Sequence, residues 1–207
     1  MMRETDYYAE ITKELEEQFN ANISANISDC KVYFTHNLVC VNLNKGLNQI
    51  IKNNGLTCKD LLSFAANAPA IDIDIFGVAV MGDHFRLMIA EIKRDRPVGL
   101  TEYSQLLGYC ISSNAQYGLL INVNAGESDE LARIIRTQPS ITHIIRLLPD
   151  KNGAKQETKL AVMRWNHKTE TLFYSNLGTL PTLGKMCEDI SSGLLADKTA
   201  DLPINND

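Results

Sequence analysis

The N-terminal part of the chain carries the pattern of two helices with a hairpin between them. Over 5–19, apolar residues recur at three- and four-residue steps with acidic residues between them, which is typical of an amphipathic helix. Residues 31–43 alternate loosely in hydrophobicity and predict a hairpin. Thr57, followed by an acid three residues later, resembles a capping box, so a second helix is expected from there to about Asn67.

Two β-branched, apolar segments follow at 71–80 and 85–93. Gly82-Asp83 between them suits a two-residue turn, because glycine tolerates the positive φ of a type II′ hairpin. Both segments are apolar on their two faces, which is typical of central strands covered on both sides. We therefore expect an antiparallel hairpin in the middle of a sheet.

Helical and strand patterns alternate through the rest of the chain. The expected elements are helices at 101–113, 128–137 and 183–195, and strands at 117–123, 141–148, 159–165 and 171–175, the last two forming an outer hairpin. Such alternation predicts an α/β fold with a central mixed β-sheet flanked by helices. The chain is interpreted as a single domain over 1–207, with a core at about 57–150, an N-terminal helix and hairpin at 1–56, and the outer hairpin and last helix at 159–197.

Composition narrows the class of protein. The 207 residues, 44% hydrophobic and 22% charged, are ordinary for one globular domain. No apolar run approaches the roughly 20 residues that span a bilayer, so we expect no membrane partner and a cytoplasmic location. Five scattered cysteines and four dispersed histidines match neither a disulfide framework nor the spacing of a zinc site.

The charge of the chain bears on nucleic-acid binding. A net charge of −5 argues against a protein that coats nucleic acid by charge alone. It argues less against a metal-dependent nuclease, because such an enzyme concentrates carboxylates at its site and binds through a local basic patch.

The candidate chemistry lies on the predicted hairpin. A turn at 82–83 sets Asp74 opposite Glu91. It also sets Asp72 opposite Lys93. Opposed residues of an antiparallel pair project to the same face with Cβ atoms about 5 Å apart, so all four charged groups are expected to converge.

Two opposed carboxylates among apolar neighbours repel each other and are costly to desolvate unless a cation is present. Lys93 supplies part of the compensation, and Mg²⁺, a hard ion that prefers carboxylate oxygens and retained waters, would supply more. Lys93 would then orient the attacking water or, if its pKa is depressed, help to deprotonate it. The alternative interpretation is a structural ion-pair cluster without catalysis.

A polar pair follows on the next predicted helix. Gln105 and Tyr109 are four residues apart and therefore share a helical face. They are candidates for contact with the substrate backbone or with the water shell of the metal. On spacing alone, simple exposure to solvent explains them equally well.

Taken in order, Asp74, the Glu91-Ile92-Lys93 segment, the Gln105-x-x-x-Tyr109 helix and the strand that follows resemble the PD-(D/E)XK nuclease superfamily. The resemblance spans about 70–123, and its motifs are short and degenerate. The chain departs from the family pattern in having Ile73 where a proline usually precedes the catalytic aspartate.

The resemblance implies a restriction-endonuclease-like core and a set of roles. Asp74, Glu91 and the Ile92 carbonyl would hold Mg²⁺, with Mn²⁺ as a substitute. Lys93 would stand at the attacking water, and Gln105 would join the catalytic set. Tyr109 is a possible accessory residue.

Two further acids are candidates for the site. Asp72 is a second candidate acid, although Asp74 is favoured because it faces Glu91. Family members often add a glutamate from an N-terminal helix, and Glu14 is chosen here over its neighbours Glu10 and Glu17, with a solvated helix face as the alternative.

Basic residues follow the strand that carries Glu91. Arg94 and Arg96 would suit phosphate contacts beside a metal site. Arg133 and Arg136 on a later helix are equally well explained as ordinary solvated charge.

The sequence therefore predicts a Mg²⁺-dependent nuclease that hydrolyses DNA phosphodiester bonds. Its expected partners are DNA and either a second copy of the chain or a larger nucleic-acid-processing complex. The alternatives are a catalytically silent copy of the fold that serves as a subunit or nucleic-acid-binding module, and a nuclease directed at RNA. The residues do not decide sequence specificity, endonuclease or exonuclease action, or biological role.

Overall fold

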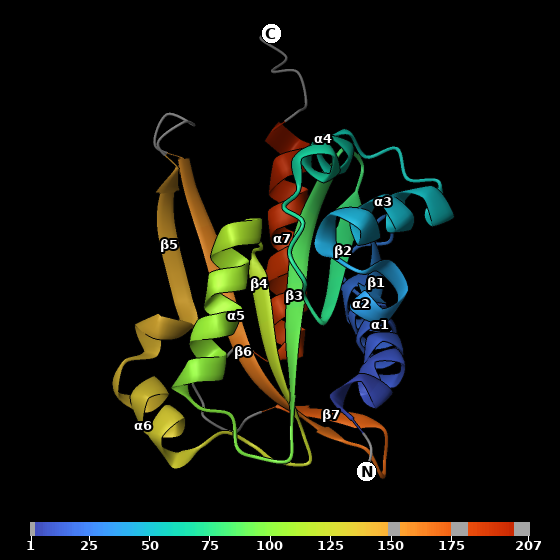
Figure 1. Ribbon diagram of the computed structural model, residues 1–207. Coiled ribbons are helices and arrows are strands. Elements are labelled where there is room, and N and C mark those ends of the chain that lie inside the picture. The colour runs from blue at the N-terminus through green and yellow to red at the C-terminus, as the bar shows by residue number, and fades with distance from the viewer. Residues whose placement is uncertain (1–2, 149–153, 175–181, 201–207) are drawn as a thin grey trace, which may run out of the picture.

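The computed structural model describes residues 3–148, 154–174 and 182–200. Its centre is a seven-stranded mixed sheet in the order β1-β2-β3-β4-β6-β5, with β7 paired to β6 (Figure 1). The strands are β1 Lys31–His36, β2 Ile75–Met81, β3 His84–Arg94, β4 Tyr117–Val123, β5 His143–Leu148, β6 Ala154–Asn166 and β7 Thr171–Tyr174. The predicted α/β class with a central mixed sheet is confirmed.

Helices cover both faces of this sheet. They are α1 Tyr8–Ser24, α2 Asn37–Cys40, α3 Leu43–Asn54, α4 Lys59–Asn67, α5 Leu100–Ser113, α6 Asp129–Thr137 and α7 Leu183–Ala200, with short 3₁₀ turns η1 Glu4–Tyr7 and η2 Pro139–Thr142. Helices α1 and α7 bury their apolar side chains in one core cluster, and α3 to α6 bury theirs in a second cluster across the sheet. In Figure 1, α5 lies in front of the sheet and α7 behind it. No helix in the described ranges is long and apolar enough to cross a membrane.

The hairpin of β2 and β3 has the predicted register. Met81 pairs with His84 and Ile75 with Ala90, so the turn falls at residues 82–83. Gly82 takes φ 58°, the left-handed region that favours glycine. Side chains alternate between the faces, and the odd-numbered residues of β3 therefore point toward α5.

The predicted hairpin at 31–43 is wrong. Strand β1 pairs with β2 over its whole length, and the chain then enters α2 instead of turning back. Helix α2 ends at Val41, whose φ of 73° and ψ of −48° belong to a γ-turn closed by Asn42 N–H and the Cys40 carbonyl at 2.9 Å. A β-branched residue is strained in that conformation, and no sequence pattern in this segment anticipates it.

Smaller corrections concern the helix starts and the C-terminal part. The α4 N-cap is Cys58 and makes no side-chain cap bond, so the capping box predicted at Thr57 is wrong. By contrast, Ser128 Oγ accepts the Leu131 N–H and caps α6 as expected. The predicted hairpin of β6 and β7 is confirmed by their antiparallel pairing. Its outer position is wrong for β6, which lies between β4 and β5 and is a central strand.

Candidate functional site

The predicted site residues gather where β2 begins and β3 nears its end. Glu91 and Lys93 are two residues apart on β3 and point to the same face, and Asp74 immediately precedes β2. The β2–β3 pairing ends at Ile75 and Ala90, so Asp74 and Glu91 are each one residue beyond the last pair. The long strand β3 therefore positions two of the three side chains, and the start of β2 positions the third.

Both carboxylate oxygens of Asp74 accept hydrogen bonds. The Tyr8 hydroxyl donates to Oδ1 at 2.5 Å, and the Ile92 N–H donates to Oδ2 at 2.8 Å. Tyr8 lies on the first turn of α1 and is almost completely buried. Burial, followed by the hydrogen bond to Asp74, raises the pKa of Tyr8, so the hydroxyl remains a proton donor. The Asp74 side chain is thus held from two elements.

The Ile92 carbonyl has an orientation suited to a ligand. In a strand, the N–H and C=O of one residue point to the same neighbouring strand. The Ile92 N–H reaches the Asp74 carboxylate, and β2 pairing ends at Ile75 and Ala90. The Ile92 carbonyl therefore points toward the space beside Asp74. None of the described strands pairs with it there.

Glu91 is a buried acid, with 3% of its surface exposed. Burial, followed by the negative charge of Asp74, raises the pKa of Glu91 to about 7. Lys93 Nζ lies 2.6 Å from Glu91 Oε1 and opposes this shift. At neutral pH the carboxyl is therefore poised between its protonated and ionised forms.

Lys93 stays charged. Burial alone would lower its pKa, but the hydrogen bond to Glu91 and the charges of Glu91 and Asp74 raise the pKa above its ordinary value. Of the two roles that the sequence left open, this favours the charged amine that orients and stabilises over the amine that deprotonates.

Sequence reasoning missed two residues of this site. Tyr8 was taken only as an apolar position of the first helix. Glu4, on η1 just before α1, acts electrostatically on Glu91, Lys93 and Tyr8. No spacing rule points to a 3₁₀ turn before the helix, so only the fold reveals that η1 packs against β3.

The glutamates predicted to join the site from the first helix have other roles. Glu14 accepts a hydrogen bond from Gln18 on its own helix, and Glu17 pairs with Lys13. Glu10 is exposed. The N-terminal acid that the structure brings near Glu91 is Glu4.

Asp72 is not opposite Lys93. The backbone leaves the sheet before Ile75, and the Ile71 carbonyl accepts a hydrogen bond from Leu43 N–H at the start of α3. Asp72 is consequently exposed. This segment belongs to the α3 connection, so the predicted convergence of four charges is reduced to three.

Gln105 and Tyr109 contact each other on the exposed face of α5. Gln105 Nε2 donates to the Tyr109 hydroxyl at 3.0 Å. Helix α5 covers the face of the sheet to which Glu91 and Lys93 point. The pair is thus on the correct side of the sheet, and its role in catalysis stays a prediction.

Arg94 and Arg96 have different surroundings. The Arg94 side chain points to the face opposite Lys93, where its guanidinium lies 5.7 Å from the centre of the Tyr7 ring and bonds Asp95 at 2.9 Å. Arg96 pairs with Glu102 at 2.9 Å and its side chain is 76% exposed. Only Arg96 is therefore presented to solvent as a phosphate contact would require.

The donors at this site are oxygen atoms of the kind that hard divalent cations bind. Within 3–148, 154–174 and 182–200, no three His, Cys, Asp or Glu side chains form a metal cluster. Asp74, Glu91 and the Ile92 carbonyl nevertheless offer two carboxylates and one backbone oxygen. Mg²⁺ commonly binds through one or two carboxylates, keeps several waters and takes its remaining ligands from substrate phosphate.

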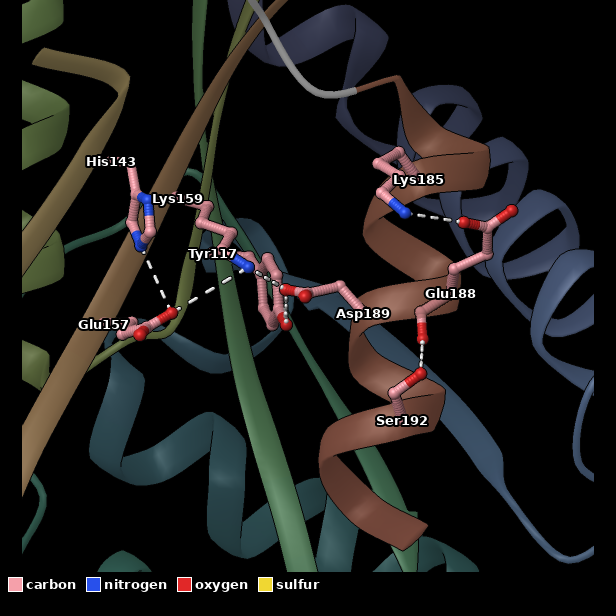
Figure 2. Close-up of polar contacts among 8 residues, drawn as sticks. All are labelled: Tyr117, His143, Glu157, Lys159, Lys185, Glu188, Asp189 and Ser192. Carbon is pink, nitrogen blue, oxygen red and sulfur yellow. Dashed lines mark hydrogen bonds and ion pairs between the residues drawn. The ribbon is translucent and has the colours of Figure 1, made fainter. Parts of the chain in front are cut away.

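A hollow lies at the opposite end of β3, where β4 is shorter than its neighbours. Several of its polar side chains pair with one another or with neighbouring residues (Figure 2). Tyr117 OH and Lys159 Nζ both bond Asp189 Oδ2, at 2.7 and 2.5 Å, and His143 Nε2 lies 3.1 Å from Glu157 Oε2. This network braces β4 and β6 against α7, and its balanced charges select no ligand class.

Comparison with known proteins finds no match: no protein-family model, no curated protein and no solved structure matches the chain. The functional argument therefore rests on the residues and the geometry described above.

Proposed function

We propose that this chain is a Mg²⁺-dependent nuclease of the PD-(D/E)XK type that hydrolyses DNA phosphodiester bonds. The observation that carries the proposal is the meeting of Asp74, buried Glu91 and charged Lys93 at one point of the sheet. A carboxyl with its pKa raised to about 7 beside a second carboxylate is a costly arrangement, and a divalent cation relieves it.

The order of elements supports the nuclease type. A helix, three antiparallel strands, a crossover helix and a parallel strand occur in the order α1, β1-β2-β3, α5 and β4, with α2, α3 and α4 inserted between β1 and β2. Asp74 lies just before the second of these strands, Glu91 lies on the third, and α5 carries the Gln105-Tyr109 pair. The proposal assigns the nuclease core to these elements.

Each residue has a distinct part in the proposed reaction. Asp74 and Glu91 supply carboxylate ligands, and the Ile92 carbonyl supplies a neutral one. A bound Mg²⁺ would stabilise charge on the scissile phosphate and lower the pKa of a nucleophilic water. Tyr8 holds the Asp74 carboxylate in place through Oδ1.

Lys93 contributes positive charge at the reacting phosphate. Its ammonium is held 2.6 Å from Glu91, and once Glu91 ligates a cation, the ammonium can donate to the attacking water and to the phosphate oxygens. Because its pKa is raised, Lys93 keeps this charge throughout the neutral range.

The test is cleavage of supercoiled plasmid in Mg²⁺ by the wild type and by two matched variants. Lys93→Met and Lys159→Met each remove a strand lysine whose amine pairs with an acid at 2.5–2.6 Å and whose side chain is 20–24% exposed. We expect nicking or linearisation by the wild type and by Lys159→Met, and a loss of about 100-fold or more in Lys93→Met. Excess chelator should abolish cleavage.

Circular dichroism of each variant checks that it folds. Equal cleavage by Lys93→Met would contradict the proposed site. Intact plasmid with every protein in both Mg²⁺ and Mn²⁺ would contradict DNA cleavage and favour the catalytically silent copy of the fold. A parallel incubation with single-stranded RNA distinguishes the RNA-directed alternative, which predicts cleavage of RNA with plasmid left intact.

A further inference from the structure

The described sheet has one edge at β1 and the other at β5 and β7, which pair with different parts of β6. Strands β1 and β5 differ in how their outward backbone groups are bonded. At β1, the side chains of α1 satisfy the outward backbone groups. Asn20 donates to the Val32 carbonyl at 2.8 Å and accepts from the Val32 N–H at 2.9 Å, and Glu16 accepts from the Phe34 N–H at 2.7 Å. These bonds block the addition of another strand, which is how proteins manage a sheet edge.

The β5 edge has no comparable cover in the described part of the chain. On β6, the Lys159 N–H points to the β4 side, where it donates to the Gln116 carbonyl at 2.9 Å. Because alternate residues point to opposite sides, Thr158 and Gln156 point to β5 and bond their partners there. The N–H and C=O groups of Ile145 and Leu147 consequently point outward.

Within the described ranges, no hydrogen bond is formed by these outward groups of Ile145 and Leu147. Of the outward groups of His143, the N–H donates to the Ser140 carbonyl and the C=O remains open. The strand also presents apolar side chains to solvent, since Ile145 is 53% and Leu147 67% exposed. An open, apolar edge strand is a template for pairing with another strand.

We propose that β5 pairs with β5 of a second copy of this chain, antiparallel and about a two-fold axis at Ile145, so that two sheets join into one. Ile145 of each copy then exchanges N–H and C=O bonds with Ile145 of the second copy. Each Leu147 N–H donates to the His143 carbonyl of the second copy. Ile145 and Leu147, the two exposed apolar side chains of β5, then lie across from residues of β5 in the second copy.

The side chains favour this register over its neighbours. With the axis at Ile145, Arg146 lies opposite Ile144 of the second copy. Moving the axis to Arg146 would set two arginines directly opposite each other, and like charges in that position are destabilising.

A second copy is an occupant that the β5 edge itself can accept. An antiparallel strand is complementary to itself under a two-fold axis, so β5 requires no separate partner. The blocked β1 edge cannot accept a further strand. Assembly therefore does not continue through β1.

The experiment uses the full chain without metal or nucleic acid, so its outcome is independent of the proposed nuclease activity. Sedimentation equilibrium at about 50 µM should give twice the chain mass of 23.1 kDa. Ile145→Lys sets two lysines opposite each other and should weaken dimerisation by about 10-fold or more. Leu38→Lys, at an exposed apolar residue of α2 (61% exposed), is the matched control and should dimerise like the wild type.

Hydrogen exchange locates the interface even if Ile145→Lys folds poorly. The amides of Ile145 and Leu147 should exchange more slowly as wild-type concentration rises. A monomeric wild type, a fully dimeric and well-folded Ile145→Lys, or exchange of these amides that is independent of concentration would each overturn the proposal. A monomer would indicate that the edge awaits a strand of another protein.

Discussion

At the scale of single residues, Asp74 shows how a metal ligand can be prepared by its neighbours. One oxygen is held by the backbone of Ile92 and the other by the hydroxyl of buried Tyr8. A carboxylate fixed in this way loses little conformational freedom when a cation binds, so its affinity depends on these two donors.

We expect Tyr8→Phe to weaken both the site and the fold. Loss of the hydroxyl removes one hydrogen bond to a charged group, which costs about 1.5–3 kcal/mol of unfolding free energy. It should also raise the Mg²⁺ concentration needed for half-maximal plasmid cleavage, by about 10-fold. Denaturant unfolding and a Mg²⁺ titration of activity measure the two effects.

The matched control is Tyr117→Phe. Tyr117 is also buried and donates to an aspartate, Asp189, at 2.7 Å, but it pairs with Met88 at the far end of the same sheet. It should lose similar stability with an unchanged Mg²⁺ requirement. A shift of the same size in both variants would mean that Tyr8 acts on stability alone.

At the scale of elements, close packing of helices on the sheet places the strands that carry the site. Helix α3 approaches β2 where Gly46 leaves room for Phe76, and β2 in turn holds Asp74 at its start. A Cβ at Gly46 would lie 2.1 Å from the Phe76 ring and 2.7 Å from Cys40 Sγ. The close packing of α3 on the sheet therefore requires glycine at position 46.

Gly46→Ala and Gly108→Ala should have opposite effects on stability. Both glycines lie within helices, but Gly108 on α5 is exposed and has nothing within 4 Å of an added Cβ. Overpacking at Gly46 should cost about 1–3 kcal/mol of unfolding free energy, whereas Gly108→Ala should add about 0.5–1 kcal/mol through helix propensity. Denaturant unfolding measures both, and a stabilised Gly46→Ala would contradict the described packing of α3.

At the scale of the whole molecule, folding and the proposed metal binding are linked through Glu91. Folding raises the pKa of this carboxyl from 4.5 to about 7. The folded state then binds more protons than the unfolded state between these values, so this group makes stability fall as pH rises through that range. A bound cation favours the ionised carboxylate and removes the penalty.

We expect thermal melting to report this linkage. Without metal, the wild type should lose about 1–3 kcal/mol of stability relative to Glu91→Gln as pH rises from 5 to 8. Added Mg²⁺ should raise the wild-type melting temperature more at pH 8 than at pH 5.5, and should leave Glu91→Gln nearly unchanged. If Mg²⁺ raised the melting temperature equally at both pH values, or equally in both proteins, the metal would not bind through Glu91.

Local sequence patterns by themselves determined much of this protein. The two-residue turn at Gly82-Asp83 set the β2–β3 register, because the loop of a hairpin fixes which residues of its two strands pair. That register was enough to predict that Asp74, Glu91 and Lys93 lie close together. The α5 and α6 helices and strand β4 were likewise predicted, since their periodicity and capping act within a few residues.

Only the tertiary structure decided which distant segments meet. Tyr8 and Glu4 reach the site because η1 and α1 pack beside the ends of β2 and β3, and Asp72 leaves it because the preceding segment follows α3. Strand β6 became central, and β5 an open edge, through pairings between residues far apart in the chain. Such contacts depend on how complete surfaces fit together, and no short-range pattern encodes them.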